Sequence, residues 1–246
     1  MWGGRAPWLV LATLTSAAAA VFGAGAYLYW APCRDQLLNG SVLAGYRLSG
    51  EFPAACLARM DAGGPLALAW RAEGDPTSDL LIAVALVTLA LAWMGFVAAH
   101  RWGGAARLVA ALPGMLTGVL GFAILARSQG AGPAGEDWLV WLAVGIDLAA
   151  LLAAGVIVQH SHGLVRLGHL VGLWGIASFG WMRTLCDYAV MVAASAANWD
   201  VPPGHGFPTA LTIAICAVAS AALGLAGRTV RPRDTRLPAM AWQQTG

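Results

Sequence analysis

Lysine is absent from this chain: all 14 basic residues are Arg, beside only 12 acidic residues. Without a lysine amine, the chain cannot form the Schiff base that retinal-type membrane proteins require, so that class is excluded. The exclusive use of Arg, together with 31 Gly, indicates a GC-rich coding sequence. From this pattern we predict a bacterial source.

Charge of either sign is also scarce. Charged residues make up 11% of the chain and hydrophobic residues 59%, whereas soluble domains carry roughly 25% charged residues. A soluble chain of this length cannot bury so much apolar surface, so a soluble enzyme and a nucleic-acid-binding domain are excluded. The formal net charge of +2 gives no reason to expect a polyanionic partner. The expected partner is the lipid bilayer.

Motifs with a known catalytic mechanism are missing. The sequence has no phosphate-binding loop, no nucleophile elbow, no HExxH motif and no CxxC pair. Nothing therefore indicates an NTPase, a serine hydrolase or a zinc protease. We assign no catalytic residue and no cofactor from the sequence, and a non-enzymatic protein is favoured.

Long apolar runs are present instead. About 20 apolar residues cross the hydrocarbon core of a bilayer as a helix. Six runs of this kind occur, at residues 8–30, 79–99, 108–126, 138–158, 167–194 and 208–226. They lack the alternation of membrane β-strands. We predict an all-α, polytopic membrane bundle of six transmembrane helices, in which the overlong fifth helix has to tilt or protrude.

The first run has an alternative interpretation as a cleaved signal peptide. Its apolar stretch is longer than the roughly 7–15 residues of a signal core, so a retained helix is favoured. With the N-terminus inside, eight Arg lie on the inner side and five on the outer side, as the positive-inside rule prefers. We therefore predict a bacterial cytoplasmic-membrane protein with both termini in the cytoplasm.

This topology divides the chain into five parts. They are an inner N-terminus (1–7), a first helix (8–30), an outer loop (31–78), a bundle of five further helices (79–226) and a basic inner tail (227–246). Aromatic residues are expected to form interfacial belts at the two edges. The inner belt comprises Trp2, Trp8 and Trp102, and the outer belt comprises Tyr27, Tyr29, Trp30, Trp138, Trp141 and Trp199.

Two of the four cysteines, Cys33 and Cys56, lie in the outer loop, and Cys56 falls within a short helix predicted at residues 53–61. An oxidising exterior permits a disulfide between them, which would stabilise the loop by roughly 3 kcal/mol. A structural disulfide is favoured, with a redox-active pair and two free thiols as alternatives. Cys186 and Cys216 lie in the fifth and sixth helices. Packed helix axes are about 8–10 Å apart, too far for a typical bridge, so both are expected to stay free thiols.

Three ionisable residues fall inside the predicted membrane spans: Asp147 in the fourth helix, and Arg183 and Asp187 in the fifth. Each costs at least about 2.5 kcal/mol on insertion scales, so all three should face protein or water. Arg183 and Asp187 are four residues apart and can pair, and Asp147 is expected to approach Arg183 from its own helix. A structural ion pair is favoured, with a proton- or cation-handling site and a substrate-orienting or catalytic site as alternatives.

Four of the five histidines lie near inner helix ends: His100, His160, His162 and His169. Imidazole ligates haem iron and transition metals, and a b-type haem needs two facing histidines. A haem or metal site from these four is therefore a hypothesis, with simple interfacial solvation favoured over it.

Two glycine patterns share one spacing. Gly114, Gly118 and Gly121 fall in the third helix, and Gly168, Gly172 and Gly175 repeat the pattern in the fifth. Small residues at this spacing let membrane helices approach closely, so we interpret both stripes as packing surfaces.

These features predict a transport component of permease type, or an accessory subunit of a membrane complex. Six spans in about 250 residues also resemble an ABC-2-type permease in size. Active transport would require other subunits or a separate cytoplasmic ATPase, because no NTP-binding motif is present. The alternative is a membrane-embedded redox protein or other enzyme that uses the inner histidines or the Asp/Arg group.

Overall fold

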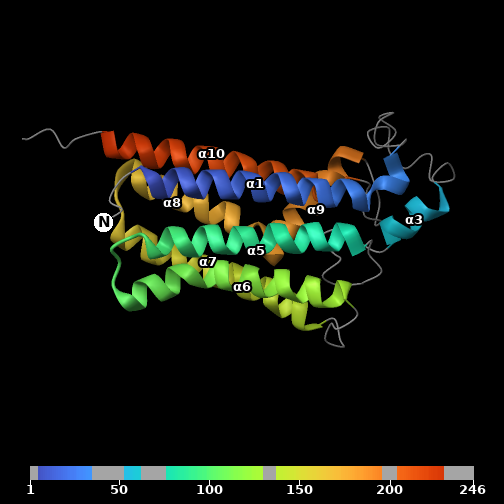
Figure 1. Ribbon diagram of the computed structural model, residues 1–246, viewed down its shortest axis with the longest axis horizontal. Helices are drawn as coiled ribbons and strands as arrows, with labels where there is room; N and C mark the ends of the chain where they lie inside the picture. The colour runs from blue at the N-terminus through green and yellow to red at the C-terminus, as the bar shows by residue number, and fades with distance from the viewer. Residues whose placement is uncertain (1–4, 35–52, 62–75, 130–136, 196–203, 230–246) are drawn as a thin grey trace, which may run out of the picture.

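The computed structural model describes residues 5–34, 53–61, 76–129, 137–195 and 204–229. Throughout these ranges the chain is helical, with short turns and no strand (Figure 1). Five helices are long and apolar enough to cross a membrane. They are α1 (Ala6–Tyr29), α5 (Pro76–Ala98), α6 (Gly104–Ser128), α7 (Asp137–His160) and α10 (Phe207–Thr229). The protein is thus a helical, multi-pass membrane bundle, as predicted.

The remaining elements are short. Two of them, η1 (Ala31–Cys33) and α3 (Ala54–Asp61), lie beyond the end of α1. Three more, α8 (Gly163–Ile176), η3 (Ala177–Phe179) and α9 (Trp181–Ser195), occupy the predicted fifth span. The helix predicted at residues 53–61 is confirmed as α3.

The single overlong helix predicted at residues 167–194 is wrong. The chain leaves helical conformation at Gly180, whose φ of −69° and ψ of 161° are those of extended backbone. A Cβ on Gly180 would overlap the carboxylate of Asp147, which approaches from α7. The apolar run is therefore divided into two shorter helices, α8 and α9, with a break at Gly180. It does not form one long tilted helix.

The long helices lie side by side along the long axis of the molecule (Figure 1), and their contacts follow a closed order around one core. Helix α1 packs between α5 and α10, α6 covers α5, α7 covers α6, and α8 packs on α10. We call one end of the bundle the histidine end, where α1, α6 and α8 begin. The opposite end, where α3 lies, is the disulfide end. Helices α8 and α9 run in succession between the two ends, and neither is among the five helices long enough to cross a membrane by itself.

Both glycine stripes are packing surfaces, as predicted. A Cβ on Gly121 would lie 3.1 Å from the backbone oxygen of Ala83 on α5, and one on Gly168 would lie 3.0 Å from that of Ser220 on α10. The Ser220 hydroxyl donates a hydrogen bond of 2.8 Å to the Gly168 carbonyl. Close approach of α6 to α5 and of α8 to α10 depends on these glycines.

Several aromatic residues predicted for the interfacial belts belong instead to the core. Trp8, Tyr29 and Trp30 are fully buried, and Trp102 is 8% exposed. They lie at helix ends, as the sequence indicates, but point inward because neighbouring helices offer them apolar contacts. Trp141 is 71% exposed, which fits an interfacial position. The side chains of Trp2, Trp138 and Trp199 lie outside the described part of the structure.

The disulfide end is held together by a cap on α1. Cys33 and Cys56 form the predicted disulfide, with Cα atoms 5.0 Å apart. The Tyr29 hydroxyl donates to the Arg59 carbonyl at 2.8 Å, and the Arg59 guanidinium lies 5.0 Å from the centre of the Tyr29 ring. Cys186 and Cys216 are free thiols, as predicted.

Candidate functional site

Asp147 lies at the interruption between α8 and α9. Its carboxylate accepts a hydrogen bond of 2.9 Å from the backbone N–H of Met182 and another from that of Trp181. The first N–H groups of a helix have no partner within the helix, and they carry partial positive charge. Asp147 therefore caps the N-terminus of α9 from a neighbouring helix.

Arg183 lies in the first turn of α9, close to this cap. Its side chain points towards a different helix, α10. Its guanidinium donates to the Thr212 hydroxyl on α10. Its Nε is buried without a hydrogen-bond partner in the described part of the chain. Within that part, Asp147 and Arg183 bind different groups and form no ion pair with each other. The side chain of Asp187 lies outside the described residues.

This arrangement brings an acid, a base and an interrupted helix to one region of the bundle. Asp147 and Arg183 are both partly exposed in the described structure. Discontinuous helices, with helix ends pointing at ions or charged groups, form the binding sites of many secondary transporters. The region is therefore suited to holding a charged solute or passing a proton.

A second polar group occupies the histidine end. The Nε2 atoms of His100 and His169 are 3.0 Å apart. Nδ1 of His100 lies 2.8 Å from the Phe96 carbonyl, and Nδ1 of His169 lies 2.6 Å from the Val165 carbonyl. His169 is 1% exposed. The structure thus joins two of the four predicted histidines across 69 residues of sequence.

Aromatic rings surround the His100–His169 pair. The ring centre of Trp8 lies 4.9 Å from that of His169, and Phe96 lies 4.5 Å from His100. Trp102 is 5.3 Å from His100 and 5.4 Å from His169. The pair therefore has an apolar shell contributed by α1, α5 and the turn after α5.

The other two histidines make separate contacts. His160 is exposed, and its Nδ1 lies 2.9 Å from the Val156 carbonyl. Nδ1 of His162 lies 3.1 Å from a guanidinium nitrogen of Arg166. Among the described residues, no group of three or more His, Cys, Asp or Glu side chains is placed to hold a metal ion. Of the four histidines in the hypothetical haem or metal site, only His100 and His169 contact each other through their ring nitrogens.

His205 is a buried residue that we did not single out from the sequence. It is 2% exposed at the disulfide end, where the Trp30 indole donates to its carbonyl at 2.9 Å. Burial lowers the pKa of its imidazole to about 4. It lies between Gly204 (φ 97°) and Gly206 (φ 102°), whose left-handed backbone forms the turn into α10. The Gly-His-Gly sequence could have predicted this turn, because glycine readily adopts the positive φ values that it requires.

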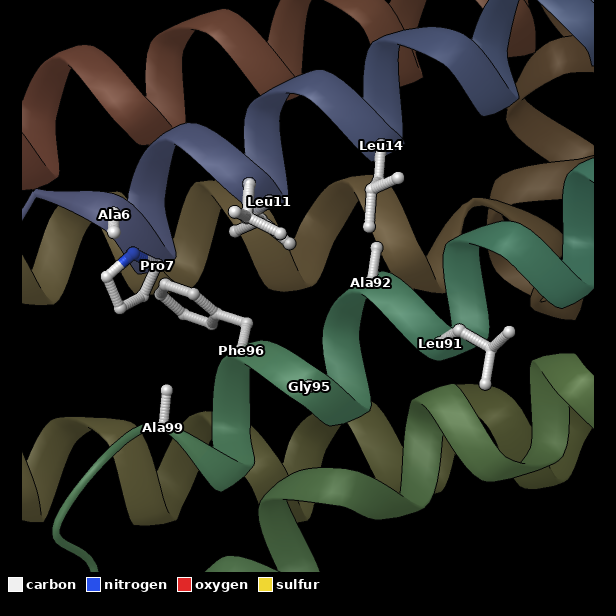
Figure 2. Close-up of a pocket in the computed structure, with 10 residues that line it drawn as sticks. Ala6, Pro7, Leu11, Leu14, Leu91, Ala92, Gly95, Phe96 and Ala99 are labelled. Atoms are coloured by element: carbon white, nitrogen blue, oxygen red, sulfur yellow. The ribbon is translucent and has the colours of Figure 1, made fainter. Parts of the chain in front are cut away.

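An apolar groove of about 420 Å³ runs between α1 and α5 at the histidine end (Figure 2). Its lining residues include Pro7 and Leu11 of α1 and Leu91 and Phe96 of α5. Figure 2 shows the Phe96 ring directed towards Pro7, between the two helices. The residues that line the groove include no charged side chain, and they belong mostly to two helices long enough to cross a membrane.

Comparisons with protein-family models, with curated proteins and with solved structures found no match for this chain. A proposal for its function therefore rests on the geometry of the described residues.

Proposed function

We propose that this membrane protein is a transport component, and that the interruption between α8 and α9 is its pathway for protons. The observation that carries the proposal is the Asp147 carboxylate on the N-terminus of α9. It combines an ionisable side chain, a helix end and irregular backbone within a membrane span.

Membrane energetics support this proposal. Irregular backbone is tolerated at membrane depth only where it is buried in protein or lines a water-filled space. Charged side chains inside the membrane are costly, and where they persist they commonly mark ion or proton pathways. Asp147 and Arg183 are both partly exposed. Contact with water, with a solute or with another subunit would offset the free-energy cost of placing these two side chains inside the membrane.

The proposal includes an orientation and a class of partner. The start of α1 and the end of α10 lie at the same end of the bundle (Figure 1). That arrangement supports termini on the same side of the membrane, and the excess of Arg on that side is the reason to place it in the cytoplasm of a bacterial inner membrane. Energy for active transport would come from a separate cytoplasmic ATPase, or from the proton gradient through Asp147.

The test is proton flux in liposomes that contain the purified full-length protein and a trapped pH-sensitive dye. A K⁺ diffusion potential drives the flux. In Asp147→Asn the amide oxygen still accepts the α9 N–H groups, so this variant should fold normally and yet lose at least tenfold in flux. Asp147→Ala removes the cap as well, and should also lose about 1 kcal/mol of stability.

Leu148→Asn is the matched control, since Leu148 neighbours Asp147 on α7 and is 58% exposed. It places an amide at the same depth but away from the α9 N-terminus, so its flux should equal that of the wild type. Equal flux in wild type and Asp147→Asn would contradict the proposal, as would a wild-type protein that conducts no protons.

A further inference from the structure

Helices α1 and α5 touch at one end and leave a groove at the other. At the disulfide end a Cβ on Gly25 would lie 3.2 Å from the Ser78 backbone oxygen, and the Ser78 hydroxyl donates to the Gly25 carbonyl at 2.8 Å. At the histidine end a Cβ on Gly95 would meet no atom within 4 Å. The Phe96 ring lies between the two helices there, directed towards Pro7 (Figure 2). The histidine end of the α1–α5 pair therefore contains open, apolar space.

The groove is narrow for its length. Its lining residues on α1 run from Ala6 to Leu14, which is about 12 Å at a rise of about 1.5 Å per residue. A volume of about 420 Å³ over that length gives a mean cross-section of about 35 Å². A helix with its side chains is about 10–12 Å across, which is a cross-section of about 80–110 Å². The groove therefore admits an extended hydrocarbon chain, and it is too narrow for a helix of another protein or of a second copy.

Positive charge lies at the end of this groove. Ala6 and Ala99 line the groove at the histidine end; Arg5 directly precedes Ala6, and Arg101 follows Ala99 after one intervening residue. Both Arg residues are exposed. No Asp or Glu occurs in the described segments at this end, which are residues 5–10, 95–110, 157–169 and 220–229. An apolar groove thus leads to a surface of positive charge without opposing acids among the described residues.

We propose that this groove binds an anionic phospholipid, with one acyl chain between α1 and α5 and the phosphate at Arg5 and Arg101. Basic pockets between transmembrane helices commonly bind anionic lipid headgroups. A guanidinium binds phosphate through charge-assisted and often bidentate hydrogen bonds. The two Arg residues belong to the two chain segments that form the groove, so a phosphate that contacts both lies at the end of the acyl chain. This site is independent of the proton pathway proposed at Asp147.

The experiment is native mass spectrometry of the full-length protein in detergent. The protein is titrated with phosphatidylglycerol, or with phosphatidylcholine that carries the same acyl chains. The wild type should bind one phosphatidylglycerol per chain, at least about tenfold more tightly than phosphatidylcholine, because only the first lipid carries a net negative charge. Glycerol phosphate has the negative charge but no acyl chain, so it should not compete.

Three Arg variants test the position of the headgroup. Arg5→Gln and Arg101→Gln should each reduce the preference for phosphatidylglycerol, and the double variant should bind the two lipids with equal affinity. Arg34→Gln is the matched control, because it removes the same charge from an exposed side chain at the disulfide end. Its preference should equal that of the wild type.

Gly95→Leu tests the position of the acyl chain. The added side chain enters the open space of the groove, so this variant should fold and bind both lipids about tenfold more weakly, because less of the acyl chain is buried. Gly155→Leu on α7 is the matched control. A Cβ at Gly155 also meets no atom within 4 Å, and Gly155 does not line the groove, so lipid binding should be unchanged.

Thermal unfolding without added lipid shows whether each variant is folded, and if Gly95→Leu is not, the Arg variants decide the question. The proposal is overturned if the wild type binds phosphatidylglycerol and phosphatidylcholine equally. It is also overturned if Arg34→Gln lowers the preference as much as Arg101→Gln, or if a folded Gly95→Leu binds both lipids as the wild type does.

Discussion

Trp8 lies where four helices meet at the histidine end. Its ring centre is 4.7 Å from Phe96 on α5 and 4.9 Å from His169 on α8. On α10, a Cβ at Gly224 would overlap the Trp8 ring, so glycine is required there for the ring to fit. A residue that resembles an interfacial anchor in the sequence thus packs against the His100–His169 pair.

At the residue scale, we expect His205 to make the stability of the fold depend on pH. Its folded-state pKa of about 4 lies below the value of roughly 6.5 expected in the unfolded chain. The unfolded state therefore binds more protons between these values, and stability falls as the pH drops from 6.5 towards 4. The loss attributable to His205 is up to about 3 kcal/mol.

Thermal unfolding in detergent between pH 7.5 and pH 4 checks this prediction. His205→Gln cannot titrate, so its unfolding temperature should fall less steeply with acid than that of the wild type. His162→Gln removes an exposed imidazole and should keep the wild-type slope. Superimposable curves for wild type and His205→Gln would show that the buried imidazole does not control acid stability.

At the element scale, the α8–α10 contact depends on the absence of side chains. A Cβ on Gly168 would lie 3.0 Å from two backbone atoms of α10 and 3.1 Å from the Trp8 ring. Backbone atoms cannot move aside as a flexible side chain does. We expect Gly168→Ala to lower stability by about 1–3 kcal/mol, the usual cost of overpacking.

Gly155 provides a control on a different helix, α7. A Cβ there would have no atom within 4 Å, so Gly155→Ala should be neutral or slightly stabilising, since alanine is the better helix former. Thermal or denaturant unfolding of the two variants in the same detergent gives the comparison. Similar stability of Gly168→Ala and Gly155→Ala would mean that α8 and α10 are less tightly packed than described.

At the scale of the whole molecule, orientation and the disulfide are linked. A disulfide persists on the oxidising side of a bacterial membrane, so the Cys33–Cys56 end is expected to face outward. A fluorescent protein fused after Gly246 should then fluoresce in the cytoplasm. An alkaline phosphatase inserted at position 70 should be active outside. The reverse pattern would invert the proposed topology.

Maleimide labelling of the protein unfolded in SDS measures the disulfide itself. Cys186 should then react without reduction, because its thiol is free. Cys33 and Cys56 should react only after reduction. Labelling of both before reduction would contradict the disulfide.

The sequence by itself determined the class of the protein, its five long helices, its cysteine pairing and the role of its glycine stripes. These follow from local composition: an apolar run of sufficient length must cross the bilayer as a helix, and two cysteines in one loop are close through the chain itself. The tertiary structure decided the interruption at Gly180, the capping of α9 by Asp147, the pairing of His100 with His169 and the burial of Trp8. Each of these depends on which helix faces meet. Residues that are far apart in the sequence come together only when the helices pack. The spacing of residues along one chain therefore does not show which of them will be in contact.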